Sequence, residues 1–266
     1  MILTRRQLIH TSLSSLLAAG LWPGALSAGD PDAGSFQFVA VNDLHYLNEK
    51  CGPWFQRMVK SFQSQPDKTD FVLISGDFAE HGTSQQHGAM QEILKTLGMP
   101  YYAVVGNHDY QSSTDRKAYE QLHPGRINYH FDHQGWQFVG LDTSEGMKSQ
   151  NVKAPQATFD WLDANLPKLD KKKPTIIFTH FPLGFGVPFL LKNANDILKR
   201  LLSYNLQAVY SGHFHGFTET KTGEVVMTTN KCCSFARGNH DKTPEKGFFV
   251  CSAKDGKVTR RFVEMK

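Results

Sequence analysis

The chain has 266 residues, of which 40% are apolar, enough to bury the core of one domain. Its formal net charge is +4, and two of those units come from adjacent arginines near the start, which leaves +2 for the rest. That charge is too small to favour a nucleic-acid partner, because proteins that bind phosphate backbones concentrate lysine and arginine on one face. The one run of lysines, residues 171–173, is typical of a solvated loop.

Residues 1–28 resemble an export signal: two arginines precede a short apolar stretch, and small residues follow it. The arginine pair indicates a twin-arginine signal, but His10 and Leu8 replace the usual lysine and phenylalanine, so the general secretory route stays open. An uncleaved membrane anchor is the alternative, although the apolar stretch is short for a span of about 20 residues. We therefore expect an exported protein, periplasmic or extracellular, with no stable membrane span in the mature chain.

From residue 29 to residue 266 we predict a single domain, and its first half alternates strand-like and helix-like patterns. Strands are predicted at 36–42, 71–75 and 101–105, and helices at 54–62 and 84–97. Gly98 and Pro100 end the second helix. This βαβαβ order favours parallel strands with helices on the faces of the sheet.

After residue 110 the pattern changes, beginning with a polar loop at 110–126. The remaining predictions are an antiparallel strand pair at 127–131 and 135–141, a helix at 155–169, a strand at 175–179, a helix at 194–203, a strand at 206–211, and antiparallel strands at 224–229, 247–253 and 257–264. Two sheets packed face to face with helices outside account for this mixture. The predicted fold class is α/β, a four-layer αββα sandwich of two mixed β-sheets flanked by helices.

Five of the predicted strands end in side chains that bind metals or transfer protons. These side chains are Asp43 and His45 after the first strand, Asp77 after the second, Asn107, His108 and Asp109 after the third, His180 after the strand at 175–179, and His213 and His215 after the strand at 206–211. In open α/β sheets, ligands bind outside the carboxyl ends of the strands. Such a set exceeds the needs of one tetrahedral ion. Two ions about 3.5–4 Å apart, bridged by one carboxylate, would use it fully.

The order and spacing of these motifs resemble the calcineurin-like metallophosphoesterase family over residues 36–216, about two thirds of the chain. Any one motif is weak, whereas five in order are specific. The resemblance implies a binuclear metal centre and a role for each residue. It implies that Asp43, His45 and His215 bind the first ion, that Asn107, His180 and His213 bind the second, that Asp77 bridges them, that His108 donates a proton and that Asp109 orients His108.

Three positions near these motifs remain open. Asp109 either orients His108 or caps a turn. Glu80 stands where relatives often carry an acidic residue, with an unassigned role. The next residue is His81, whereas serine/threonine protein phosphatases carry arginine there, and imidazole lacks the bidentate grip of a guanidinium on phosphate. This difference argues against a dedicated phosphoprotein phosphatase.

Three further segments allow two interpretations each. Residues 238–241 repeat the Gly-Asn-His-Asp letters of residues 106–109 but follow no strand, so they are predicted to form a loop, from which Arg237 or His240 could reach a phosphate. The apolar loop 181–192 either binds a hydrophobic part of the substrate or a partner, or folds onto the core. The cysteines either form disulfides or stay free and buried, and their spacing excludes a zinc ribbon: Cys51, Cys232, Cys233 and Cys251.

The expected activity is metal-dependent hydrolysis of phosphoric esters. Two divalent transition-metal ions, Fe, Mn, Zn, Co or Ni, would lower the pKa of a shared water, and the resulting metal-bridged hydroxide would attack phosphorus directly. His108 would protonate the leaving group. The expected substrate is a small-molecule phosphoester, with a diester favoured. The alternatives are a phosphomonoesterase or pyrophosphatase on the same site, or a non-catalytic metal-binding scaffold; oligomeric state is not indicated.

Overall fold

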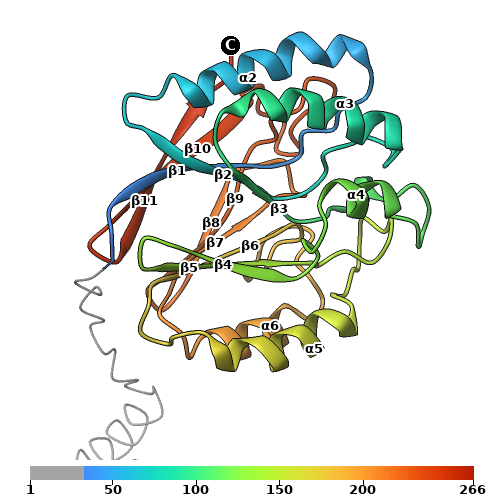
Figure 1. Ribbon diagram of the computed structural model, residues 1–266. Coiled ribbons are helices and arrows are strands. Elements are labelled where there is room, and N and C mark those ends of the chain that lie inside the picture. The colour runs from blue at the N-terminus through green and yellow to red at the C-terminus, as the bar shows by residue number, and fades with distance from the viewer. Residues whose placement is uncertain (1–32) are drawn as a thin grey trace, which may run out of the picture.

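The computed structural model describes residues 33–266, and the predictions made for residues 1–28 lie outside the described residues. Figure 1 shows two β-sheets packed face to face between two layers of helices. This arrangement is the predicted four-layer αββα sandwich. Within residues 33–266, no helix combines the length and the apolar character needed to cross a membrane.

The first sheet has five strands in the order β11-β10-β1-β2-β3. Its parallel part consists of β1 (Phe36–Val41), β2 (Thr69–Ile74) and β3 (Tyr101–Ala103). β10 (Gly247–Lys254) pairs antiparallel with both β1 and β11 (Lys257–Glu264). Every residue of β1 is buried, as expected for a strand whose two faces are both covered. The predicted parallel opening of the chain is therefore confirmed.

The second sheet has six strands in the order β4-β5-β6-β7-β9-β8. These strands are β4 (Tyr129–His133), β5 (Trp136–Leu141), β6 (Thr175–Thr179), β7 (Leu206–Ser211), β8 (Thr218–Thr222) and β9 (Val225–Thr229). β4 and β5 form the predicted antiparallel pair. β9 was predicted to be antiparallel; it pairs antiparallel with β8 but parallel with β7. The residue pattern does not predict β8, because its sequence, Thr-Glu-Thr-Lys-Thr, lacks alternating apolar residues.

Helices cover the outer face of each sheet (Figure 1). α2 (Gly52–Gln63) and α3 (Ser84–Leu94) lie on the five-stranded sheet, and α5 (Gln156–Asn165) and α6 (Ala194–Leu201) on the six-stranded one. α4 (Lys117–Leu122) lies within the segment predicted as a polar loop. Short 3-10 helices complete the set: η1 (Glu49–Cys51), η2 (Lys95–Leu97), η3 (Asn107–Asp109) and η4 (Leu166–Lys168). The predicted helices at 84–97 and 155–169 thus end in 3-10 turns.

Aromatic rings join the two sheets. Phe38 on β1 stacks on Phe71 of β2 with ring centroids 5.3 Å apart, and Phe71 meets Phe138 of β5 edge to face at 5.2 Å. Tyr210 of β7 lies 6.0 Å from Phe38. Such pairs add about 0.5–1.5 kcal/mol each beyond the burial of their surface. This packing fixes one sheet against the other, so the carboxyl ends of strands from both sheets meet at one edge.

The structure distinguishes between the two alternatives for the cysteines, disulfides or free thiols. All four, Cys51, Cys232, Cys233 and Cys251, are free and buried. Burial raises the pKa of the Cys251 thiol to about 12. These side chains therefore act as small apolar groups in the core rather than as cross-links.

Candidate metal centre

The backbone adopts a left-handed conformation at five of the seven predicted metal ligands. Their φ angles are 55° at Asp43, 50° at His45, 56° at Asp77, 64° at His213 and 48° at His215. Positive φ is uncommon for residues other than glycine and costs about 1–3 kcal/mol each, so it persists only where the surroundings impose it. Sharp turns directly after the strands therefore direct these side chains toward one another.

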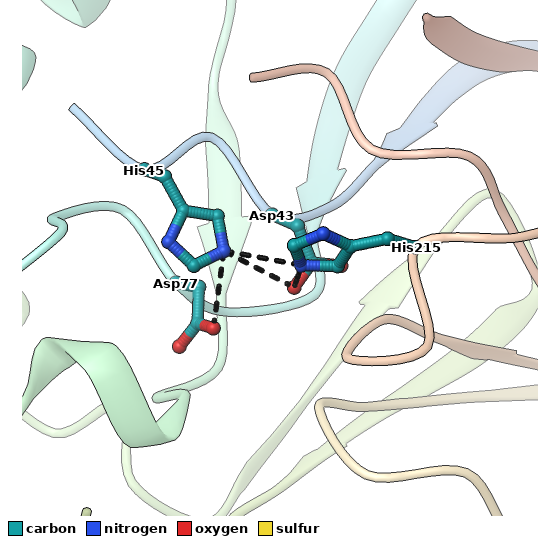
Figure 2. A group of neighbouring side chains, drawn as sticks. All are labelled: Asp43, His45, Asp77 and His215. Carbon is teal, nitrogen blue, oxygen red and sulfur yellow. Dashed lines mark hydrogen bonds and ion pairs between the residues drawn. The ribbon is translucent and has the colours of Figure 1, made fainter. Parts of the chain in front are cut away.

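The first donor group combines Asp43, His45, Asp77 and His215, all at most 4% exposed (Figure 2). His45 Nε2 lies 3.1 Å from His215 Nε2 and 3.4 Å from Asp77 Oδ2. His215 Nε2 lies 2.9 Å from Asp43 Oδ1. Figure 2 shows these donor atoms converging from three separate segments of the chain. Two imidazole nitrogens and two carboxylates facing one point match the coordination chemistry of a transition-metal ion.

The second donor group combines Asp77, His180 and His213. His180 Nε2 lies 3.3 Å from Asp77 Oδ2, 3.1 Å from Asn107 Oδ1 and 3.2 Å from His213 Nδ1. The opposite ring nitrogens donate to backbone carbonyls, His180 Nδ1 to Ser75 at 2.9 Å and His213 Nε2 to Ser149 at 2.8 Å. These bonds place the ring protons away from the centre and leave the inner nitrogens able to bind a cation.

Asp77 belongs to both donor groups. The sequence-based hypothesis required this carboxylate to lie near Asp43, His180 and His213, and it does, because His45 and His180 approach Asp77 Oδ2 from opposite groups at 3.4 and 3.3 Å. The seven residues predicted as ligands are therefore brought together around one shared carboxylate. That arrangement fits two neighbouring cations.

The electrostatics of the site also fit cations. Burial raises the pKa of Asp43, but His215 and His45 more than offset it and hold that pKa well below its usual range. Burial lowers the pKa of His180, yet Asp77 and Asp43 raise it to about 9. Burial and the neighbouring His180 lower the pKa of His213 to about 3. Ionised carboxylates are therefore buried beside imidazoles that are not all protonated. A divalent ion would supply the positive charge that these buried carboxylates need.

His108 and Asp109 follow Asn107 within η3. The His108 side chain is 27% exposed, and its Nδ1 donates to the Glu80 carbonyl at 2.8 Å, which leaves Nε2 free for a substrate. Asp109 is fully buried and accepts hydrogen bonds from four backbone N–H groups, those of Gly106, Asp77, Phe78 and Ala79. Within residues 33–266 no hydrogen bond or ion pair joins the Asp109 carboxylate to the His108 ring.

The role of Asp109 therefore differs from the one implied by the resemblance. Its carboxylate caps the turn that follows β2, which is the second interpretation that the sequence allowed. The residue that the His108 ring contacts by a hydrogen bond is Glu80. The reason is local geometry, since consecutive side chains in a 3-10 turn point in different directions. Asp109 supports the centre indirectly, because the turn that it caps carries Asp77.

Sequence reasoning left Glu80 without a role, and the structure places it in the site. Glu80 Oε2 lies 3.1 Å from His45 Nδ1, on the side of the ring opposite the donor group. Arg237 donates to both Glu80 carboxylate oxygens, from Nε at 2.9 Å and from Nη2 by a shorter contact. Burial raises the pKa of Glu80, but His45 and Arg237 lower it to about 2. Its position three residues after Asp77 was the one signal in the sequence.

The repeated tetrapeptide at 238–241 forms a loop, as predicted, and it packs against the centre. The carbonyl of Gly238 accepts a hydrogen bond from His215 Nδ1 at 3.2 Å, and the backbone N–H of His240 donates to the His215 carbonyl at 3.1 Å. The ring of His240 lies 4.9 Å from that of His215. This loop therefore fixes His215 from outside the donor group.

One part of the apolar loop 181–192 packs onto the core, and another part stays exposed, so each of the two interpretations fits part of the loop. Phe181, Leu183 and Leu191 are buried in the core, and the Phe181 ring lies 4.0 Å from that of His213. Phe185 is 86% exposed at the tip. The inner part of the loop therefore forms a wall of the donor site, and its tip remains available to solvent.

Gly106 gives a test of how closely the centre is packed. An added Cβ would lie 2.1 Å from Asp77 Oδ1 and 2.6 Å from the Asp77 nitrogen. We expect Gly106→Ala to displace Asp77, to lower the free energy of unfolding by about 1–3 kcal/mol and to reduce bound metal. Gly238→Ala, at the matching position of the repeated tetrapeptide at 238–241, is the control, because a Cβ there meets nothing within 4 Å. Equal metal content and stability in both variants would contradict this account.

Comparisons with known proteins agree with this geometry. The sequence pattern described as calcineurin-like phosphoesterase matches residues 36–217. A probable glycerophosphodiester phosphodiesterase, GpdQ, from Arcobacter nitrofigilis is 27% identical over 172 residues, which cover 61% of this chain and 62% of that protein. A probable cyclic nucleotide phosphodiesterase from a Synechococcus species is 28% identical over 197 residues, 69% of this chain and 75% of that protein.

The fold also has solved counterparts. A dimetal phosphatase from Danio rerio superposes with a TM-score of 0.62 at 16% identity, covering 89% of this chain and all of that one. The two mixed sheets and their flanking helices are therefore a known architecture. The family pattern covers well over half of this chain and includes every predicted ligand. By that match, the chain belongs to the calcineurin-like phosphoesterase family.

Proposed function

We propose that this protein is a metal-dependent phosphodiesterase that acts on a small-molecule phosphoester. The observation that carries the proposal is Asp77, whose Oδ2 atom lies within 3.4 Å of His45 and 3.3 Å of His180 and so is shared by two donor groups. We infer two divalent transition-metal ions, Fe, Mn, Zn, Co or Ni, because mixed nitrogen and oxygen donors suit that series. Asp43, His45 and His215 would hold one, and Asn107, His180 and His213 the other.

When bound, such ions would supply an activated water at neutral pH and neutralise charge on phosphoryl oxygens. The residues of the chain would then orient the ester and protonate its departing oxygen. Glu80 holds the His108 ring by its carbonyl, so that the free Nε2 can donate a proton to the departing oxygen of an ester. The hydrogen bond from the His108 backbone N–H to Asp77 Oδ1, at 2.8 Å, ties this proton donor to the shared carboxylate.

A diester is favoured over a monoester or pyrophosphate. Support comes from the relatives: one is named a probable glycerophosphodiester phosphodiesterase and another a probable cyclic nucleotide phosphodiesterase. The aligned part covers only 62% of the first of these proteins, so its substrate is carried over here as a proposal alone. Monoester or pyrophosphate hydrolysis on the same site is the second candidate.

The experiment is a substrate panel on the purified protein. The protein would be reconstituted with Mn, Fe, Zn, Co or Ni and assayed on bis(p-nitrophenyl) phosphate, p-nitrophenyl phosphate and a pyrophosphate ester. We expect the diester to be turned over fastest and a chelator to abolish turnover. Faster monoester cleavage would favour the second candidate. Metal binding without any turnover would contradict the enzymatic proposal and leave the scaffold alternative.

We further propose export to the periplasm or beyond through a twin-arginine-type signal. Its support is the sequence of residues 1–28, two arginines followed by an apolar stretch. Export would separate the protein from cytoplasmic cyclic nucleotides, which argues for a different diester. Cell fractionation of the full chain tests the proposal, with both arginines replaced by lysine as the comparison. Recovery of the unaltered full chain in the cytoplasm alone would contradict it.

A further inference from the structure

The segment that follows β9 contributes a guanidinium to the metal centre from outside the family match, which ends at residue 217. The segment is a loop that its own side chains hold by hydrogen bonds. The Asn239 side chain accepts a hydrogen bond from the backbone N–H of Cys232 at 3.0 Å and donates to the carbonyl of Glu245 at 2.6 Å. The buried Ser234 hydroxyl accepts from the backbone N–H of Arg237 at 3.0 Å. These bonds fix the backbone at Arg237.

The Arg237 side chain is fixed as well. Its Nε and Nη2 donate to the two oxygens of Glu80, a bidentate contact that sets the plane of the guanidinium. Glu80 is only 9% exposed and itself lies 3.1 Å from His45 Nδ1. Arg237 is thus separated by a single carboxylate from a predicted metal ligand and, through the Glu80 carbonyl, from the proton donor His108.

One nitrogen of the Arg237 guanidinium, Nη1, does not take part in the contact with Glu80. Nη1 forms no hydrogen bond or ion pair with the rest of residues 33–266, and the side chain is 39% exposed. Besides Glu80, the carboxylates of Asp77 and Asp43 raise the pKa of Arg237, which places its charge within electrostatic reach of both donor groups. A rigid, accessible cationic donor beside a pair of cation sites is suited to an anion that reaches the same place.

We propose that Arg237 is a substrate-binding residue, whose Nη1 donates to a phosphoryl oxygen of the bound phosphoester while Glu80 holds the guanidinium in place. The inference rests on the proposed function and names a contact that the family match does not contain. It assigns Arg237 to the binding of the phosphoryl group itself, in addition to its contact with Glu80.

The test is binding of inorganic phosphate, measured by calorimetry on the metal-saturated protein, together with kinetics on bis(p-nitrophenyl) phosphate. We expect Arg237→Met to weaken phosphate binding by about ten- to a hundredfold, the usual range for loss of a charge-assisted hydrogen bond. We also expect KM to rise more than kcat falls. Arg237→Lys, which keeps the charge but loses the planar fork, should lie between the parent and Arg237→Met.

Arg200→Met is the matched control. Arg200 also makes a bidentate contact with a carboxylate, from Nε at 2.6 Å and Nη2 at 3.1 Å to Asp163, and is similarly exposed at 34%. It links α6 to α5 on the outer face of the other sheet (Figure 1). We expect this variant to bind phosphate as the parent does. Metal content is measured in every variant, and Arg237→Lys decides the outcome if Arg237→Met loses metal.

Three outcomes would separate the inference from the proposed function. Phosphate dissociation constants in Arg237→Met and Arg237→Lys that equal the parent value, with diester turnover intact, would overturn the role of Arg237 alone. A fall in kcat at unchanged KM and unchanged phosphate affinity would also overturn it, since it would reduce Arg237 to a support for Glu80. A parent that binds phosphate through Arg237 but cleaves no ester would overturn the proposed activity instead.

Discussion

Replacing Asp77 with asparagine should abolish diester turnover and remove at least one of two metal ions per chain. The carboxylate is shared by the two donor groups, so its loss weakens both at once. An amide of the same size offers only one oxygen and no charge. Since metal ions contribute several kcal/mol to such reactions and each 1.36 kcal/mol is tenfold in rate, we expect a loss of about 10³-fold or more. Metal content by mass spectrometry and turnover on bis(p-nitrophenyl) phosphate measure both effects.

Asp70→Asn is the matched control for this variant. Asp70 lies near the start of β2, far from the end of the strand that precedes Asp77. The Asp70 carboxylate contacts His133 at 2.9 Å. That variant should keep both ions and the parent rate. If Asp77→Asn also kept two ions per chain and the parent turnover, the shared carboxylate would have no part in catalysis and the proposed binuclear centre would be wrong.

Replacing His108 with alanine should leave the metal content unchanged and slow turnover of esters with poor leaving groups by about 10²–10⁴-fold, the usual contribution of a positioned acid. The His108 ring lies beside His45 and Glu80 but belongs to neither donor group around Asp77, and its Nδ1 donates to the Glu80 carbonyl, so its removal leaves both of those groups intact. Substrates with good leaving groups need no proton in the transition state. A series of diesters with leaving groups of rising pKa measures the difference.

His81→Ala is the comparison for that experiment. His81 is an exposed histidine next to Glu80, in the segment between β2 and α3, and its backbone N–H donates to the Gln86 side chain at 2.8 Å. Its removal should change neither metal content nor the dependence on leaving-group pKa. Should His108→Ala hydrolyse alkyl diesters at the parent rate, a different group must donate the proton.

Much of the metal centre could be predicted because each ligand has a local signal. Asp43, Asp77 and His180 each come shortly after the end of an apolar strand that the residue pattern identifies, and parallel strands end at a common edge. The fold class followed from the same alternation of strands and helices. The polar edge strand β8 was missed because it carries no apolar pattern.

Contacts between distant segments had no such signal. Glu80 and Arg237 are 157 positions apart, and only the packing of the loop after β9 against the turn after β2 joins them. The direction of the Asp109 side chain, away from His108 and into the backbone of the neighbouring turn, likewise depends on three-dimensional geometry.

The amino-acid sequence by itself determined which residues stand at the strand ends and therefore which chemistry this protein can perform, because apolar periodicity and strand termination are local properties. The tertiary structure alone decided how these donors divide into two groups around Asp77, and which charged residues support them. Those arrangements depend on the packing of one sheet against the other, which side-chain volumes and long-range contacts control and which no local pattern records.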